Sequence, residues 1–548
     1  MKPPNARSSG LGSIPQALET DGVPQRILAY VPLATSQPLR SQDSDQARLS
    51  ISSCKGAWMM RRTQPNSSWS TALTAGPSAL ETFDRLRAGF MAGVQDPQLR
   101  RAAVFLLGVG AGLLPLMAGS AKAALTKLPT DGADNLLMLI GSALVLLMTP
   151  GLAFFYGGFT RAKNVLNCMM MSFFLMGLIG VLWVVIGYSL AFGTGFGSPF
   201  IGGLEFFMLN GVGGELGDAP LADGFAISAS SFAMFQGMFA IITPALISGA
   251  LVERINFKAW FWFSLIWSLF IYSPMAKMVW GGGFLGCFGI GAIDFAGGTV
   301  VHIASGVSAL VAAAIIGKRT NWPEQKSPPH NVPFILLGAG LLWFGWFGFN
   351  GASMFASKTA GYPFLTTTTA ASAALLTWCL LEWFLDGKPT AVGAATGAVA
   401  GLVGITPAAG FVYMGHSIVI GALTAVACLI AVRVKMAIKF DDALDTFMVH
   451  GVGGTVGALL TGVFAVKALV PADYFPVSAK VIEEGGNFAL FVVQFKAVII
   501  TYGFVGLGTA VILWVLGVIM PLRVTPEDEE RGLDYVLHGE EAYDPMAY

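Results

Sequence analysis

The chain has 548 residues, of which 54% are hydrophobic and only 12% are charged, and its mean hydropathy is +0.66. A soluble domain carries roughly 25% charged residues, so this composition excludes an ordinary soluble enzyme and wholesale disorder. The 32 Lys and Arg residues balance the 32 Asp and Glu residues, which removes any broad electrostatic case for a nucleic-acid partner. The five cysteines form no CxxC pair, so we expect neither a disulfide framework nor a zinc site.

Residues 1–101 differ in composition from the rest of the chain. Ser, Gln, Pro and Arg recur there, and no apolar run is long enough to span a bilayer, so we interpret this segment as a disordered leader. An organelle transit peptide is one alternative, although Glu19 and Asp21 are unusual in such peptides, which are poor in acidic residues. An over-extended gene start, with Met91 as the true first residue, is another.

Residues 102–123 have the pattern of a secretory signal peptide. An Arg-Arg pair precedes a short apolar run, and Ala121-Lys122-Ala123 supplies a cleavage site of the A-x-A type. Cleavage there would leave the mature chain beginning outside the cell. An additional membrane helix is the alternative, although the run is shorter than the roughly 20 residues that a span needs.

Residues 124–521 contain apolar segments that are each long enough, or nearly so, to cross a bilayer as a helix. The eleven predicted spans are 136–156, 165–191, 227–250, 259–276, 298–316, 334–355, 363–384, 390–410, 416–435, 446–466 and 489–519. The sequence therefore predicts an all-α polytopic membrane protein with a tail at 522–548. An odd number of spans places the two ends of the chain on opposite faces of the membrane.

Lys and Arg are unevenly distributed among the loops. Loops after odd-numbered spans are basic and include Arg161, Arg254 and Arg319, whereas the loop from 193 to 227, after the second span, has no Lys or Arg. Because basic loops stay in the cytoplasm, we expect an outside N-terminus and a cytoplasmic C-terminus in a plasma (inner) membrane.

The start of the fifth span resembles the start of the tenth. Asp294 lies eight residues before His302, Asp442 lies eight residues before His450, and each His has a glycine four residues later. We interpret spans 1–5 and 6–10 as two repeats, whose odd span number requires opposite orientations. Inverted repeats place a transport site near mid-membrane between the halves. Chance similarity of two glycine-rich helices is the alternative.

Of the five histidines, His302 and His450 lie inside predicted spans, whereas His416 is at the end of one. Ionisable residues inside a membrane are candidates for function, and burial disfavours the charged imidazole. We therefore expect two neutral rings that each donate and accept a hydrogen bond and share a pore-lining role. The alternatives are packing histidines bonded to neighbouring helices and a zinc site, for which no third ligand is nearby in sequence.

Aromatic residues gather at the presumed outer end of the same region. Phe235 and Phe239 lie in FQGMFA, Trp280 in MVWGGG and Phe349 in WFGFN. Trp offers the best aromatic face for a cation, worth up to about 2 kcal/mol once water is excluded. Packing is the alternative for any single Phe, because the chain holds 40 of them. Lys277, three residues before Trp280, would weaken cation binding there unless its side chain turns outward.

Eight motifs from about residue 133 to the C-terminus resemble the Amt/MEP/Rh ammonium transporter family, and the Trp of MVWGGG resembles its Amt branch. They are GLAFFYGGFTRAKNVL, FQGMFA, SGALVERINF, MVWGGG, GAIDFAGGTVVHI, WFGFNGAS, MVHGVGGTVG and RGLDYVLHGEEAY. The resemblance implies a homotrimer with one pore per subunit, eleven spans with an inverted 5+5 repeat, ammonium or methylammonium as substrate, and no cofactor. The first hundred or so residues have no counterpart in the family.

The resemblance also implies roles for nine residues of this sequence. Four correspond to an outer ammonium-recruitment site: Phe235, Phe239, Trp280 and Ser353. Two correspond to a stacked phenyl gate, Phe239 and Phe349, and two to twin pore histidines, His302 and His450. Asp294 is similar to an aspartate beneath the recruitment site with a structural or electrostatic role, and Tyr156 to a tyrosine linked to a proton route.

We therefore expect a transporter that recruits ammonium at an aromatic site, deprotonates it and conducts it through an apolar pore. Potassium has no neutral form and would be rejected. An ammonium sensor signalling through the tail is the alternative, although residues 522–548 are far fewer than the roughly 50 of a small domain. A membrane enzyme is disfavoured, because the sequence lacks a recognisable nucleophile and base pair, metal-ligand spacing or phosphate loop.

The charged tail has two interpretations. It resembles the cytoplasmic C-terminal region of the family, which in many bacterial members couples subunits and accompanies blockade of the pore by a PII signalling protein from inside. The run from Glu527 to Glu530 is equally typical of a solvated, disordered tail.

Overall fold

The computed structural model describes residues 131–212, 227–324, 328–472 and 475–543. The predicted leader at 1–101 and the candidate signal peptide at 102–123 lie outside the described residues. The described residues belong to one compact unit and are helical, with a single isolated bridge between Ile255 and Arg523 in place of any sheet. The predicted all-α class is confirmed.

Fourteen α-helices make up most of the described residues. In chain order they are α3 (Gly132–Phe159), α4 (Val165–Leu182), α5 (Tyr188–Phe192), α6 (Ala229–Leu251), α7 (Phe257–Trp267), α8 (Ser273–Val279), α9 (Ala304–Ile316), α10 (Val332–Gly351), α11 (Gly361–Asp386), α12 (Ala391–Ile405), α13 (Met414–Ala437), α14 (Val452–Phe464), α15 (Pro476–Ile519) and α16 (Pro526–Arg531). Five π-helical segments extend, connect or follow them: η3 (Trp183–Gly187), η5 (Ser268–Tyr272), η6 (Gly298–Ile303), η8 (Phe447–Gly451) and η10 (Asp534–His538).

Ten of the described helical stretches are long and apolar enough to cross a membrane. The eighth predicted span, 390–410, is the exception, because α12 has only 15 residues, or about 22 Å against a hydrocarbon core of about 30 Å. Pro407 lacks the N–H that would continue the helix, and its carbonyl accepts a hydrogen bond from Phe295 N at 3.2 Å. The predicted count of eleven membrane-crossing helices is therefore not confirmed.

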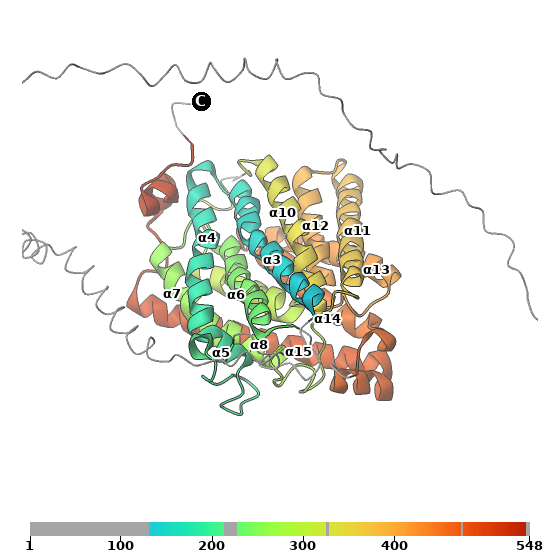
Figure 1. The fold of residues 1–548 in the computed structure, drawn as a ribbon. Coiled ribbons are helices and arrows are strands. Elements are labelled where there is room, and N and C mark those ends of the chain that lie inside the picture. Colours follow the sequence, from blue (N-terminus) through green and yellow to red (C-terminus); the bar gives the residue numbers. More distant parts are fainter. Residues whose placement is uncertain (1–130, 213–226, 325–327, 473–474, 544–548) are drawn as a thin grey trace, which may run out of the picture. The chain divides into compact units, whose positions relative to one another are not determined.

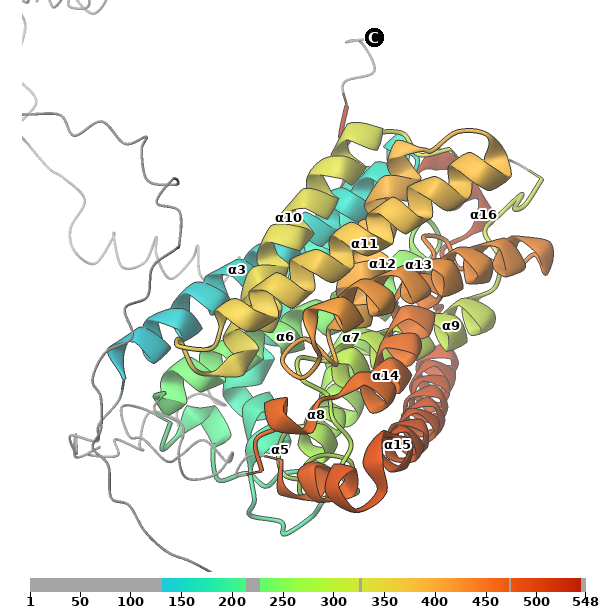
Figure 2. The ribbon, with the colours of Figure 1, turned by 90° about the vertical axis from the view of Figure 1, so that its right-hand side faces the viewer.

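The helices pack mainly lengthwise (Figures 1 and 2). α3 lies against α10 and α6, α11 packs on α12 and α13, and α15 runs along α14 and α9. α15 begins earlier than the predicted eleventh span and bends at Gly486, whose φ of +65° is a conformation that glycine adopts without strain.

The loops that follow the odd-numbered spans meet at one end of the bundle, which we call the arginine face. Glu253 accepts hydrogen bonds from Arg161 Nε and Arg319 Nη1, both at 3.1 Å, and Asp441 accepts one from Arg319 Nη2 at 2.8 Å. Burial alone would raise the pKa of Glu253, but the charges of Arg319 and Arg161 outweigh it and hold the pKa below its ordinary value. The opposite end carries Trp280 and is called the Trp280 face. The basic loops thus share one face, as their distribution predicts.

The two histidine-bearing segments run in opposite directions, as the predicted inverted repeat requires. Asp294 precedes η6 at the Trp280 face, and α9 ends near the arginine face at Ile316. Asp442 precedes η8 at the arginine face, and α14 ends near the Trp280 face at Phe464. In each repeat the aspartate accepts hydrogen bonds from backbone N–H groups at the start of the π-helical segment.

The two glycines that follow the histidines allow these segments to cross closely. A methyl group on Gly306 would lie 2.2 Å from Gly451 N, and one on Gly454 would lie 3.0 Å from His302 Cβ. Each glycine therefore faces the histidine region of the other repeat. Small residues at such crossings let the backbones of membrane helices approach, and here they bring the two histidines together.

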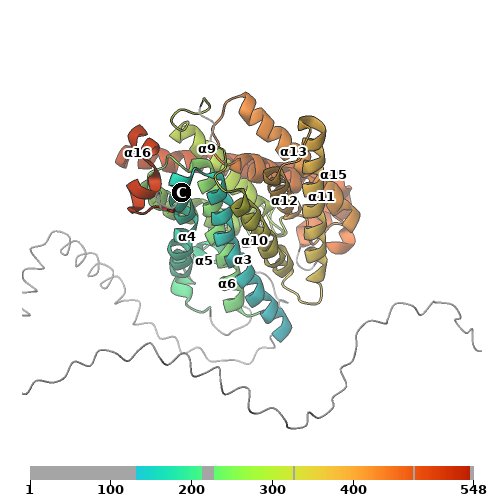
Figure 3. The same cartoon turned by 90° about the horizontal axis from the view of Figure 1, so that it is seen from above.

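The tail is docked against the first repeat at the arginine face. Asp534 accepts hydrogen bonds from Leu166 N and Asn167 N, at 3.0 and 2.8 Å, at the start of α4. Glu529, of which only 1% is exposed, accepts a hydrogen bond from Thr320 N at 2.9 Å. Figures 1 and 3 show α16 on the side of α4, away from α11. Of the two interpretations of the tail, solvated disorder does not apply to its described residues.

Replacing Glu529 with glutamine should loosen this docking. Glu529 also pairs with Arg523 Nε at 2.5 Å, and hydrogen bonds to a charged group contribute about 1.5 to 3 kcal/mol each. We expect trypsin to cleave after Arg531 about five to ten times faster than in the wild type, measured by mass spectrometry of the released 532–548 peptide. Glu527→Gln, an exposed neighbour, is the matched control and should cleave like the wild type. Equal cleavage of both variants would contradict the anchoring role.

Candidate functional site

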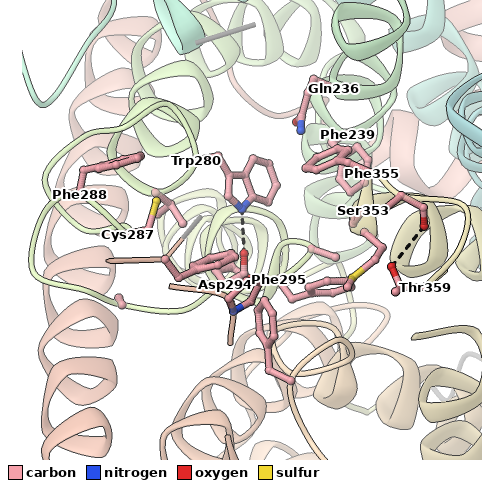
Figure 4. Close-up of a pocket in the computed structure, with 18 of the residues that line it drawn as sticks. Gln236, Phe239, Trp280, Cys287, Phe288, Asp294, Phe295, Ser353, Phe355 and Thr359 are labelled. Atoms are coloured by element: carbon pink, nitrogen blue, oxygen red, sulfur yellow. Dashed lines mark hydrogen bonds between the residues drawn. The ribbon is translucent and has the colours of Figure 1, made fainter. Parts of the chain in front are cut away.

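A cavity of about 270 Å³ lies at the Trp280 face, and we call it the Trp280 cavity. It is lined by the N-terminal parts of α3 and α6, by the loop between α8 and η6, by the segments that follow α10 and α12, and by Pro471 and Phe475 before α15. Three of the four predicted recruitment residues line it: Phe239, Trp280 and Ser353 (Figure 4). The fourth, Phe235, is not among the lining residues and packs against Phe239, with ring centroids 4.9 Å apart.

Hydrogen bonds fix the side chains of this cavity. Trp280 Nε1 donates to Asp294 O at 3.0 Å, which sets the orientation of the indole (Figure 4). Ser353 Oγ donates to Phe349 O at 2.7 Å. Because the hydroxyl proton of Ser353 is used in this way, its oxygen is left to accept a hydrogen bond from a solute in the cavity.

The Asp294 carboxylate holds the start of η6. Oδ1 accepts hydrogen bonds from Gly297 N and Gly298 N, and Oδ2 from Thr299 N and Val300 N, at 2.6 to 3.1 Å. Its side chain is 5% exposed and lines the cavity. The carboxyl group thus caps the segment that carries His302 and also lines the cavity.

Lys277 turns away from the Trp280 cavity. Its ammonium donates to Gly193 O at 2.8 Å and to Gly281 O at 2.7 Å, and the residue is 4% exposed. It is not among the residues that line the cavity. Its side chain is buried against carbonyl oxygens and does not reach outward to water.

A file of rings leads from Trp280 into the bundle. Trp280 meets Phe239 at 5.8 Å between ring centroids, and Phe239 meets Phe349 at 4.4 Å with the planes tilted by 43°. Phe349 lies nearly parallel to His302 at 5.9 Å, and His302 to His450 at 5.3 Å. The two phenyl rings thus separate the Trp280 cavity from the histidines.

The two histidines meet at the centre of the bundle. His302 Nδ1 and His450 Nδ1 lie 3.3 Å apart, so one nitrogen donates and the other accepts, and the two neutral rings adopt opposite tautomers. Both side chains are at least 96% buried. His302 Nε2 is buried and has no hydrogen-bond partner among the described residues, and burying an unpaired polar atom is costly. A small polar solute beside the rings would satisfy it.

Both histidines line a narrow apolar cavity, which we call the histidine cavity. Its volume is about 10 Å³, close to the roughly 10 to 15 Å³ that a single water molecule needs by the same measure. Apart from the imidazoles, the Trp346 indole and the Met148 thioether, its walls are hydrocarbon side chains from α3, α6, η6, α10 and α12. It admits a molecule about as large as water and offers almost nothing to hydrate a charge.

A third cavity of about 20 Å³ continues from His450 toward the arginine face. It is lined by Tyr156, Asp445 and Thr446 among others. Tyr156 OH donates to Leu246 O at 3.1 Å, and the Asp445 carboxylate pairs with Lys435 Nζ at 2.5 Å. We call it the Tyr156 cavity, and it is more polar than the histidine cavity.

Reasoning from sequence missed most residues that line the Trp280 cavity, among them Gln236, Asp134 and Phe355. Gln236 lies three positions before Phe239 on α6, so both share a helix face, and this spacing in FQGMFA could have revealed it. Asp134 and Phe355 come from other segments, and no local pattern points to them. Gln236 Oε1 is buried without a hydrogen-bond partner among the described residues, and Asp134 accepts a hydrogen bond from Ser357 N at 2.6 Å.

Comparisons with known proteins agree with this geometry. Residues 136–543 match the model of the Ammonium Transporter Family. The chain is similar to the ammonium transporter of Bacillus subtilis, with 46% identity over 415 residues that cover 75% of this chain and 98% of that protein. It is also similar to the ammonium transporter of Aquifex aeolicus, with 45% identity over 443 residues that cover 79% of this chain and 97% of that protein.

The fold of this chain is also similar to folds among solved structures. The fold is similar to that of Saccharomyces cerevisiae Mep2, with a TM-score of 0.67 and 35% identity over 77% of this chain and 93% of that one. It is also similar to a sensor Amt protein, with a TM-score of 0.67 and 28% identity over 74% of this chain and 98% of that one.

Proposed function

This chain belongs to the ammonium transporter family, and we propose that it recruits ammonium in the Trp280 cavity, removes a proton from it and conducts ammonia past the paired histidines. Trp280, Phe239 and Ser353 contact the ion, and Phe235 supports the Phe239 ring from behind. Phe239 and Phe349 form the gate. The observation that carries the proposal is the change from a roomy aromatic cavity to an apolar cavity of about 10 Å³ behind the contacting rings of Phe239 and Phe349.

The energetics favour passage of the neutral form. Moving a small cation into a medium of low dielectric constant costs on the order of 20 kcal/mol in the idealised limit, and an aromatic contact returns only about 2 kcal/mol. Ammonium can transfer its proton to an imidazole nitrogen of the histidine pair, such as the unpaired Nε2 of His302, whereas potassium has no proton to lose and keeps its charge. The His302 and His450 rings then supply the only polar groups that ammonia needs, one acceptor and one donor.

The proton follows a route that we assign to the histidine pair and Tyr156. The Nδ1 atoms of His302 and His450 are already in hydrogen-bonding contact, and His450 and Tyr156 line the same Tyr156 cavity. This arrangement supports a relay toward the arginine face, where ammonia regains a proton.

The proposal extends to the membrane orientation, processing and assembly of the transporter. We propose that the Trp280 face lies outside a plasma (inner) membrane and the arginine face in the cytoplasm, because basic loops are retained there. We further propose that the chain is made with a signal peptide at 102–123, assembles as a homotrimer, and takes up ammonium as a nitrogen source. The tail docked beside α4 at the arginine face would meet a PII signalling protein in cells that contain one.

The proposal is tested with purified protein in liposomes on a solid-supported membrane. Ammonium pulses should give a saturable current, and potassium pulses at the same concentration should give none. A potassium current would overturn the selectivity argument. No current together with undiminished methylammonium uptake in cells would overturn the separate proton route and leave electroneutral passage of the gas. No current and no uptake would overturn transport altogether.

An ammonium sensor is the second candidate function, and the similarity to a sensor Amt protein favours it. The docked tail gives such a sensor a means of response, because Glu529 and Asp534 tie it to loops of the bundle. Loss of both current and uptake, together with an ammonium-dependent change in tryptic cleavage after Arg531, would support the sensor in place of the transporter.

A further inference from the structure

We propose that the Trp280 cavity also binds organic ammonium ions that carry an aromatic ring, and that these ions block the pore without crossing it. The inference rests on the proposed recruitment of ammonium in the same cavity. It adds a second subsite that accommodates the organic part of the ion.

The first argument is the size of the cavity. Ammonium is about as large as a water molecule, which needs roughly 10 to 15 Å³ of cavity by this measure, whereas the Trp280 cavity offers about 270 Å³. Ammonium is assigned contacts with only part of the wall of this cavity, namely Phe239, Trp280 and Ser353. The remaining space is large enough for a ring attached to the ammonium group.

The second argument is the chemistry of the remaining wall. Phe295, Phe411 and Phe475, which we call the Phe411 cluster, line the cavity and pack edge to face, with ring centroids 5.2 and 5.0 Å apart. Cys287 and Phe288 extend this apolar wall on one side (Figure 4). An aromatic body placed here would bury apolar surface and pack edge to face with the cluster.

The third argument is charge. Asp134 and Asp294 line the cavity, and no Lys, Arg or His is among its described lining residues. Lys277, the nearest cation along the chain to Trp280, directs its ammonium to Gly193 O and Gly281 O. Gln236 Oε1, buried without a partner among the described residues, is an acceptor for the N–H groups of the ion. These features favour a cation over a neutral molecule of the same shape.

The fourth argument explains why such an ion would stay in the cavity. The Phe239 and Phe349 rings lie 4.4 Å apart between centroids, and the histidine cavity behind them has a volume of about 10 Å³. A benzyl group does not fit through this passage even after its ammonium group loses a proton. The ion therefore competes with ammonium at the Trp280 cavity and is not transported.

The test uses benzylammonium as the probe and ammonium currents from the full chain in liposomes as the readout. Benzylammonium should raise the ammonium concentration for half-maximal current at least several-fold, leave the maximal current unchanged, and give no current of its own. Benzyl alcohol, the neutral control, should be at least ten times weaker. Absence of competition while ammonium currents are normal would overturn this inference alone, whereas absence of ammonium currents would overturn the proposed function.

Two variants locate the subsite. Phe475→Ala should require about ten times more benzylammonium for the same inhibition, relative to its own half-maximal ammonium concentration, because an aromatic contact is removed. Phe488→Ala is the matched control, since this residue lies on α15, the helix that Phe475 precedes, and is 77% exposed. Calorimetric titration of the purified wild type with benzylammonium should show one site displaced by ammonium. Equal inhibition of both variants, a current carried by benzylammonium, or equal potency of benzyl alcohol would each contradict the proposal.

Discussion

Replacing His302 with leucine should lower the ammonium current at least tenfold. Leucine keeps the apolar packing but removes the Nδ1 contact with His450 and the unpaired Nε2. A buried polar group that loses its partner costs about 1 to 3 kcal/mol, and each 1.36 kcal/mol in the barrier is a factor of ten in rate. The measurement is the peak current on a solid-supported membrane, normalised to the amount of reconstituted protein.

The controls use the other histidines. His416 lies at the start of α13 and stacks on Phe464 at 4.8 Å, outside the three cavities, so His416→Leu should leave the current unchanged. Because His302 and His450 act as one hydrogen-bonded unit, the effects of changing them should not add. The double variant His302→Leu with His450→Leu should therefore lose little more than either single variant. A full, ammonium-selective current in His302→Leu would contradict the role of the pair.

The sequence predicts the parts of this structure that depend on local pattern. Apolar runs mark nearly all of the membrane-crossing helices, because burial in a bilayer demands them. The paired spacing of Asp294 with His302 and of Asp442 with His450 predicts the opposed segments, since the same eight-residue interval recurs in both. The basic loops predict a common face, which the ion pairs of Glu253 with Arg161 and Arg319 confirm.

What the sequence could not predict depends on contacts between distant segments. The shortened α12 follows from Pro407, whose carbonyl is used by Phe295 instead of by the helix. The Lys277 side chain points toward the carbonyl oxygens of Gly193 and Gly281, which lie 84 and 4 residues away in the sequence. The docked tail depends on Asp534, which caps a helix that starts more than 360 residues earlier. Charge composition alone does not distinguish such a tail from a solvated one.

Replacing Asp294 with asparagine should destabilise the protein more than any other carboxylate exchange proposed for this site. The carboxylate accepts four backbone N–H groups, two on each oxygen, and the amide nitrogen of asparagine would face two of them as a second donor. Hydrogen bonds to a charged acceptor contribute about 1.5 to 3 kcal/mol each, so the loss is about 3 kcal/mol or more. We expect the melting temperature of the purified protein to fall by roughly 3 °C or more.

Carboxylate exchanges at Asp442 and Asp386 should lower the melting temperature less than the exchange at Asp294. Asp442 accepts two backbone N–H groups, from Thr446 and Phe447, so Asp442→Asn should have an intermediate effect. Asp386 pairs with Arg433 at the surface, where both side chains are nearly half exposed, and such pairs contribute about 1 kcal/mol or less, so Asp386→Asn should melt close to the wild type. Because η6 carries His302, the loss of its cap should also lower the current. An Asp294→Asn protein that melts normally but needs more ammonium for half-maximal current would show instead that this carboxylate acts on the substrate through its charge.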